Sequence, residues 1–192
     1  MTILTLGLLI FLGTHSTRIF ADGWRTRQLA RLGEQGWKGF YTVLSLLGFG
    51  LIIWGYGQTR SLPVDLWNPP NWTRHLAALL TVPAFVLVVA AYVPGNRFKP
   101  LLGHPMIAGV ALWAVAHLLA NGRLGDLLLF GAFLLWALID FAAARRRDRL
   151  TGTRYPAGSL GRDALVLVIG LAAWGIFVKF AHLWLIGVAP FA

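Results

Sequence analysis

Long apolar stretches separated by short charged segments are the feature that most constrains this chain. Six stretches stand out, at residues 2 to about 21, 40–56, 75–93, 105–120, 124–144 and 163 to about 190. A transmembrane helix needs about 20 predominantly apolar residues, with about 17 as a lower limit. In lipid, a helix satisfies its backbone hydrogen bonds within a single segment. The pattern therefore predicts an all-α fold, a polytopic transmembrane helix bundle of about six helices.

The composition supports a membrane protein over a soluble one. Only 12% of the 192 residues are charged, whereas a soluble domain carries about 25%. The net charge of +10 would suggest nucleic acid in a soluble protein, but here the cations collect in short loops, so no nucleic-acid partner is expected. The absence of cysteine excludes disulfides and thiolate metal sites and leaves His, Asp and Glu as metal ligands.

The distribution of Lys and Arg predicts how the bundle is oriented. Cytoplasmic loops carry an excess of these residues, and three of the five loops hold most of them. Loops one, three and five are therefore predicted to be cytoplasmic, with both termini outside. The basic residues are Arg18, Arg25, Arg27, Arg31 and Lys38 in loop one, Arg97 and Lys99 in loop three, Arg145, Arg146, Arg147, Arg149, Arg154 and Arg162 in loop five, and Arg60, Arg74 and Arg123 on the opposite side.

Two further expectations concern organisation. No internal repeat or change of composition marks a boundary, so residues 1–192 are expected to form a single integral membrane domain. Loop one is long enough for a surface helix whose Trp24, Leu29, Leu32 and Trp37 would lie among the lipid headgroups.

Four ionisable side chains fall within the predicted spans, namely those of His15, His117, Asp140 and Lys179. Each costs from about 2.5 kcal/mol upward in a bilayer and so needs a partner or a function. Structural roles are available: His117 could bond a neighbouring carbonyl, and His15 could reach the headgroups. Asp140 could pair with Arg18 or His15, and Lys179 could extend to the interface.

The depths of the histidines restrict which of them could share a metal ion. At about 1.5 Å per residue, His15 lies roughly 9 Å and His117 roughly 20 Å from the cytoplasmic boundary. Two axial imidazoles on one iron need Cα atoms about 12 Å apart, which a tilted arrangement of His15 and His117 permits. His104 and His117 are about 20 Å apart along one helix and cannot share an ion.

Four short motifs follow one another along the chain. They are, in order, Phe11-Leu12-Gly13-Thr14-His15-Ser16, Gly103-His104-Pro105, Leu112-Trp113-Ala114 and His117-Leu118-Leu119-Ala120-Asn121-Gly122. Their order and spacing resemble those of the NnrU family, integral membrane proteins associated with bacterial denitrification. The likeness covers nearly the whole chain up to the arginine cluster, and it implies a multi-pass protein of the bacterial inner membrane.

The same domain is similar to that of plant 15-cis-zeta-carotene isomerase, a membrane enzyme that binds haem b through two axial histidines. On this resemblance the ligands fall on His15 and His117, and His104 is a further candidate. The resemblance therefore implies a bis-histidine haem b site with one ligand from the first span and one from the fourth.

Haem propionates need cationic or hydrogen-bonding partners. Depending on which way the ring faces, these partners are expected to be Arg18 on the cytoplasmic side, or Lys179 and Asn121 on the other.

Three functions remain open from the sequence. The first is a haem-binding accessory protein needed for nitrite or nitric-oxide reductase function. The second is an enzyme, a redox-gated haem-dependent cis–trans isomerase of a carotenoid-like polyene. The third is a cofactor-free transporter or assembly factor whose histidines are structural or carry protons. Membership of such a family does not by itself choose among them.

Overall fold

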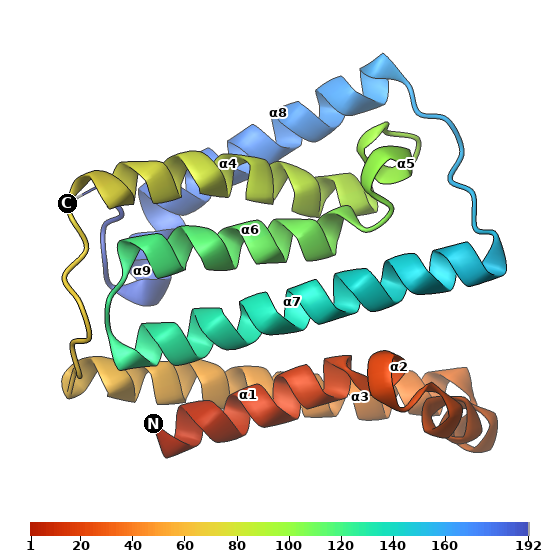
Figure 1. Ribbon diagram of the computed structural model, residues 1–192, viewed down its shortest axis with the longest axis horizontal. Coiled ribbons are helices and arrows are strands. Elements are labelled where there is room, and N and C mark those ends of the chain that lie inside the picture. Colours follow the sequence, from red (N-terminus) through yellow and green to blue (C-terminus); the bar gives the residue numbers. More distant parts are fainter. Residues whose placement is uncertain (192) are drawn as a thin grey trace. The chain divides into compact units, whose positions relative to one another are not determined.

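A computed structural model describes residues 1–191, and every regular element in this part of the chain is a helix (Figure 1). Ala192, which the predicted single domain includes, lies outside the described residues. The elements are α1 (Thr2–His15), α2 (Thr17–Phe20), α3 (Asp22–Ser61), α4 (Trp72–Tyr92), α5 (Phe98–Leu102), α6 (Pro105–Ala120), α7 (Leu124–Thr151), α8 (Leu160–Ile176), the π-helical turn η1 (Phe177–Ala181) and α9 (His182–Ile186).

Within residues 1–191, four helical segments are long and apolar enough to cross a membrane: α3, α4, α7 and the continuous stretch Leu160–Ile186. Two shorter apolar helices, α1 and α6, have 14 and 16 residues, or about 21 and 24 Å of helix. The prediction of an all-α polytopic membrane protein is confirmed. The number of six spans and the position of both termini outside stay predictions.

Two helix boundaries differ from those expected. The first predicted span, 2 to about 21, is interrupted because α1 ends at His15 and a separate short helix, α2, follows Ser16. Ser and Thr side chains compete with helical hydrogen bonds, and here Thr14 and Thr17 bond the carbonyl oxygens of Ile10 and Thr14. Helix α3 starts at Asp22 rather than near residue 40, but it breaks at Gly33, where φ is 71°.

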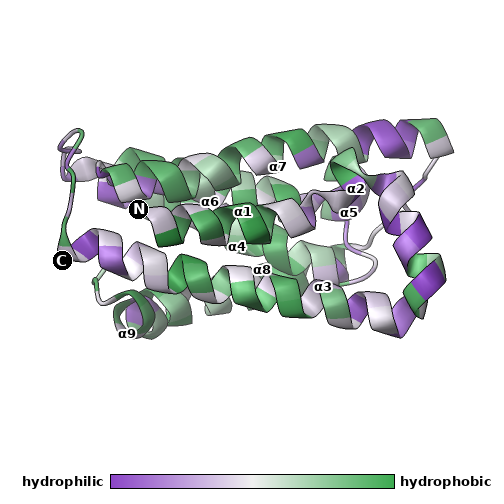
Figure 2. Cartoon of the chain, turned by 90° about the horizontal axis from the view of Figure 1, so that it is seen from below, coloured by the Kyte–Doolittle hydropathy of each residue, from purple (hydrophilic) through white to green (hydrophobic). Residues whose placement is uncertain are grey.

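The part of α3 before Gly33 corresponds to the surface helix expected in loop one. It turns away from the rest of α3 and carries many hydrophilic residues (Figure 2). Trp37 is buried within the protein, and its ring centroid lies 5.8 Å from that of Trp24. The position of these residues among the headgroups stays a prediction.

The chain divides into two compact units. Unit 1 contains α1, α2, α3 and the first part of α7, up to Trp136. Unit 2 contains α4, α5, α6, the part of α7 from Ala137 onward, and the helices that follow. The expectation of a single domain stays a prediction.

Within unit 1, glycines allow α1 to pack closely along α3. A Cβ atom at Gly48 would lie 2.7 Å from the backbone nitrogen of Phe11, and one at Gly7 would lie 2.6 Å from that of Ile52. Small residues at such contacts let helix backbones approach in membranes. Away from α1, the surface of α3 is apolar and exposed: Val43 and Leu46 are 65% and 64% exposed, as expected for side chains that face lipid.

Within unit 2, α4 packs against both α6 and α8 (Figure 1). A Cβ atom at Gly109 of α6 would lie 2.8 Å from the carbonyl oxygen of Ala84, and Val86, Ala90 and Val166 form a small buried apolar cluster. The buried amide of Asn96 ends α4 by donating to the carbonyl oxygen of Ala90, at 2.8 Å.

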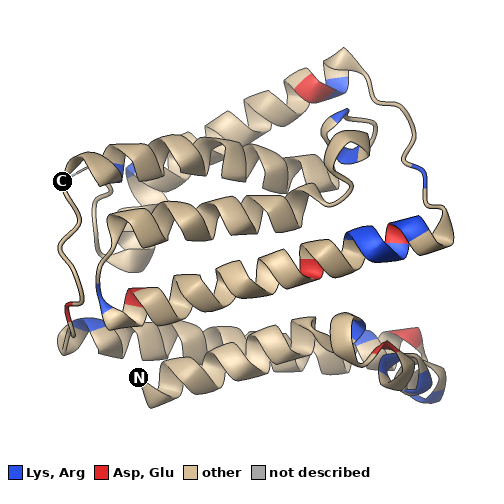
Figure 3. Ribbon diagram, viewed as in Figure 1, with Lys and Arg blue, Asp and Glu red and all other residues tan. Residues whose placement is uncertain are grey.

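The predicted cytoplasmic loops three and five lie in contact in unit 2. The backbone nitrogen of Arg97 donates to the Asp163 carboxylate at 2.7 Å, and that of Ser159 donates to the Gly95 carbonyl at 2.9 Å. Most of the Lys and Arg residues of this unit gather at α5, the end of α7 and the start of α8 (Figure 3). One end of unit 2 is therefore strongly basic, while the cytoplasmic position of these loops stays a prediction.

Candidate functional site

His15 lies in the last turn of α1, where its ring is held by the backbone of the preceding turn. Its Nδ1 lies 2.7 Å from the carbonyl oxygen of Phe11, and its ring stacks on the Phe11 ring with centroids 4.2 Å apart. A carbonyl oxygen only accepts hydrogen bonds, so the proton is on Nδ1. The neutral imidazole then carries its lone pair on Nε2, the form that can ligate a metal.

Aromatic side chains surround His15 within unit 1. The rings of Tyr41 and Trp136 stand edge-on to it, with centroids 5.2 and 6.1 Å away. Among the described residues, two buried side-chain polar atoms have no hydrogen-bond partner, the Nε1 of Trp136 and the Oγ of Ser45. Buried polar atoms are nearly always paired, so an unpaired donor next to this histidine marks the region as a candidate binding site.

His117 lies in the last turn of α6, in unit 2, and repeats the arrangement of His15. Its Nδ1 is 2.8 Å from the carbonyl oxygen of Trp113, and the centroids of the two rings are 5.1 Å apart. The same reasoning puts the proton on Nδ1 and the lone pair on Nε2. Both predicted ligands thus share one local geometry, although they belong to different units.

The three predicted propionate partners have different surroundings. The side-chain amide of Asn121 donates to the carbonyl oxygen of His117 at 2.9 Å, so it caps the end of α6. Arg18 is exposed on α2. Lys179 is exposed on η1, with its Nζ 5.4 Å from the centre of the Phe180 ring. The structure brings Asn121 to His117 within unit 2.

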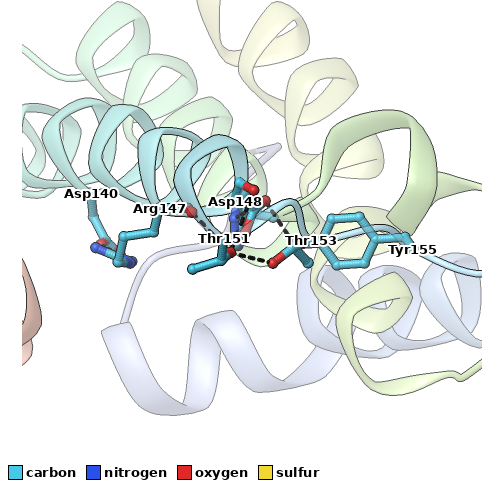
Figure 4. Close-up of polar contacts among 7 residues, drawn as sticks. Asp140, Arg147, Asp148, Thr151, Thr153 and Tyr155 are labelled. Carbon is cyan, nitrogen blue, oxygen red and sulfur yellow. Dashed lines mark hydrogen bonds and ion pairs between the residues drawn. The ribbon is translucent and has the colours of Figure 1, made fainter.

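His104 is held in the opposite way. Its Nε2 lies 2.9 Å from the Asp148 carboxylate, and the same carboxylate oxygen accepts a 2.9 Å hydrogen bond from the Tyr155 hydroxyl. In this arrangement Nε2 donates to a carboxylate, and it is not the nitrogen that would offer a lone pair to a metal. Figure 4 shows Asp148 at the end of α7 and Tyr155 in the segment that follows.

Sequence reasoning missed Asp148 and Tyr155. Both lie in the basic loop five, whose arginines predict only the orientation of the bundle. Asp148 is a lone acidic residue within an arginine-rich run, and this isolation was the available signal. Burial and the hydrogen bond to Asp148 raise the pKa of the Tyr155 phenol above its usual value. The phenol therefore stays a hydrogen-bond donor.

Two contacts complete the polar cluster of this basic end. Asp140, a residue of the predicted fifth span, has its carboxylate 3.7 Å from the guanidinium of Arg147, one partner the sequence analysis did not consider (Figure 4). Gly103 has a φ of 76°, and a Cβ atom there would lie 2.8 Å from Nη1 of Arg145. The chain therefore needs glycine before His104 for both its backbone conformation and its space.

A shallow hollow lies near these residues in each unit. The hollow of unit 2, about 230 Å³, is lined by His104 and Tyr155 among others, and that of unit 1, about 180 Å³, by Thr14 and Tyr41 among others. Across residues 1–191, no three His, Asp or Glu side chains gather into a cluster that could hold a metal ion. A haem with two axial imidazoles requires no such cluster.

The sequence was compared with curated proteins, with solved structures and with models of protein families. No curated protein and no solved structure matches the sequence. The family model described as NnrU protein matches residues 3–190, a range that includes His15, His104 and His117 with their partners. The chain therefore belongs to the NnrU protein family.

Proposed function

We propose that this NnrU-family membrane protein binds haem b, with His15 and His117 as axial ligands, and acts as an accessory to nitrite or nitric-oxide reductase function. The observation that carries the proposal is a contact that the two residues share. In both residues Nδ1 donates to the carbonyl oxygen four residues earlier. Metal-ligating histidines nearly always donate their other ring N–H in this way, which fixes the ring and raises the basicity of the ligating nitrogen.

The surroundings of the two residues fit a flat aromatic cofactor. Each imidazole packs on an aromatic ring one turn before it, Phe11 or Trp113. Next to His15, the unpaired Nε1 of Trp136 is a donor that a polar ligand would satisfy. Bound haem would supply an iron that changes redox state and can exchange an axial ligand.

Other residues would orient the haem in its site, and the basic loops would orient the protein in the membrane. Arg18, Lys179 and Asn121 are the proposed propionate partners, although the Asn121 amide already caps α6. The proposed site of action is the bacterial inner membrane, with loops one, three and five in the cytoplasm. The basic end of unit 2, where loops three and five meet, supports this orientation.

An absorption spectrum tests haem binding directly. The protein is produced with excess haem, purified in detergent and measured oxidised and reduced, with a pyridine haemochrome assay to identify and count the haem. We expect a Soret band, one haem b per chain, and a low-spin ferric signal in electron paramagnetic resonance from two imidazoles. An apoprotein without a Soret band would overturn the proposal and favour a cofactor-free transporter or assembly factor.

A second pair of measurements separates an accessory protein from an enzyme. The reduced haem protein is incubated with 9,15,9′-tri-cis-zeta-carotene, and a strain lacking the gene is assayed for nitrite and nitric-oxide reductase activity. We expect an unchanged isomer ratio and a reductase defect that the intact chain restores. Conversion of the polyene with normal reductase activity would instead establish a haem-dependent isomerase.

A further inference from the structure

The hollow of unit 2 lies at the basic end of that unit, beside His104. It has a volume of about 230 Å³, and its lining comes from α4, α5, the start of α6 and the segment after α7. The lining residues are Ala91, Lys99, Gly103, His104, Pro105, Met106, Ile107 and Tyr155. This lining is independent of the proposed haem ligands His15 and His117.

The polar part of the lining attracts anions. Residues 97–99 and 140–163 carry eight Lys and Arg residues and three Asp residues. Each Asp is already engaged: Asp140 with Arg147, Asp148 with His104, and Asp163 with Arg97. The exposed Lys99 of the lining therefore sits in an excess of positive charge that the carboxylates do not balance.

The other part of the lining is hydrocarbon. Ala91, Met106 and Ile107 belong to the apolar helices α4 and α6, just where α6 begins. Water in contact with such side chains gains no hydrogen bonds from them, whereas an acyl chain fills the space at no polar cost. One hollow thus combines a cationic rim with an apolar wall at the end of two apolar helices.

We propose that this hollow binds an anionic phospholipid, with the headgroup phosphate at Lys99 and the upper acyl chain along Met106 and Ile107. Basic pockets at the cytoplasmic ends of membrane helices are suited to anionic headgroups. Among the described residues, Nδ1 of His104 has no hydrogen-bond partner. With Nε2 donating to Asp148, Nδ1 is an acceptor, which suits a hydroxyl of a glycerol headgroup. Phosphatidylglycerol offers both the phosphate and the hydroxyl.

Lipid titration of the detergent-solubilised full chain tests the site. Native mass spectrometry measures the binding of phosphatidylglycerol and of phosphatidylcholine, and thermal unfolding is followed with each lipid and with sodium phosphate. We expect selective binding of phosphatidylglycerol, a rise in melting temperature with that lipid, and no rise with phosphate. Equal binding of the two lipids, or an equal rise with phosphate, would overturn a phospholipid site.

Two matched pairs of variants locate the site. Lys99→Gln should weaken phosphatidylglycerol binding about fivefold, which corresponds to about 1 kcal/mol for one cation near an anionic lipid, whereas Arg146→Gln removes the same charge from an exposed position outside the lining. Ala91→Phe fills the apolar part, and Ala142→Phe places the same ring on an exposed face of α7. We expect loss only in Lys99→Gln and Ala91→Phe. Equal loss within both pairs would show that general surface charge and lipid contact, not this hollow, hold the lipid.

Discussion

His15 and His117 differ from His104 in which ring nitrogen the protein holds. The first two lie in the last turns of apolar helices and donate from Nδ1 to a backbone carbonyl of their own helix. His104 precedes α6 at the basic end of unit 2 and donates from Nε2 to a carboxylate 44 residues along the chain. Carbonyl and carboxylate oxygens both accept, so these contacts assign the ring proton to Nδ1 in His15 and His117 and to Nε2 in His104. The same residue type therefore carries its ring proton on a different nitrogen in the two regions, because the acceptor lies on a different side of the ring.

The largest expected effect comes from removing a proposed ligand. His117→Ala and His15→Ala should each lower haem affinity by roughly 100-fold or more, because even loss of a partner of a metal ligand costs 10–100-fold. Haem content by pyridine haemochrome, measured on protein from the membrane fraction, checks this. His104→Ala is the matched control and should keep its haem. Equal losses in all three variants would show that the distinction between the histidines is wrong.

The next largest effect tests whether the backbone carbonyl matters to His15. Gly48→Ala places a Cβ against the backbone of Phe11, so the α1 turn that holds Nδ1 must shift. We expect haem affinity to fall roughly 10-fold, since a displaced second partner misorients the ligand. Gly50→Ala, on the same helix with no atom within 4 Å of the new Cβ, should bind haem like the wild type. An unchanged affinity in Gly48→Ala would mean that the carbonyl contact is dispensable.

Asp148→Asn should affect the region around His104 and leave the proposed haem ligands unaffected. It weakens two hydrogen bonds to a carboxylate, from His104 and Tyr155, at a cost of about 2 kcal/mol in unfolding free energy. Unfolding in mixed micelles measures this loss, and haem content should not change. Glu34→Gln, which removes an exposed ion pair with Lys38, is the matched control and should leave the stability close to that of the wild type, because exposed ion pairs contribute little. A drop in haem content in Asp148→Asn would link the polar cluster to the haem site.

The smallest effect concerns the pH dependence of the Tyr155 contact. The pKa of the Tyr155 phenol is raised in the folded protein. The protonated phenol therefore stabilises the folded protein fully below about pH 10, which is its pKa in the unfolded chain. This stabilisation is lost as the pH rises through the folded value. Tyr155→Phe should therefore cost about 1 kcal/mol near pH 8, and the difference from wild type should shrink above pH 10. A difference that stays constant up to pH 11 would mean that the phenol does not titrate with folding.

Much of the fold was predictable because a membrane helix can be identified from a short run of apolar residues. The predicted stretches 75–93, 105–120 and 124–144 lie within or close to α4, α6 and α7. The break after His15 was not predicted, since it depends on how Thr14 and Thr17 satisfy local carbonyls. Asp148 was not predicted as a site residue because it lies among the arginines of loop five. Its partner His104 lies on another segment, and the sequence alone does not show that the two are in contact.

The sequence by itself determined that this is a helical membrane protein, because long apolar segments with few charges can satisfy their backbones in lipid only within regular structure. It also indicated His15 and His117 as candidate site residues, since ionisable groups in such segments are costly. Tertiary structure alone decided the polar cluster of Asp148 with His104 and Tyr155, and with it which nitrogen of His104 is held. Hydrogen bonds between distant segments depend on how those segments pack, and no local pattern encodes that packing.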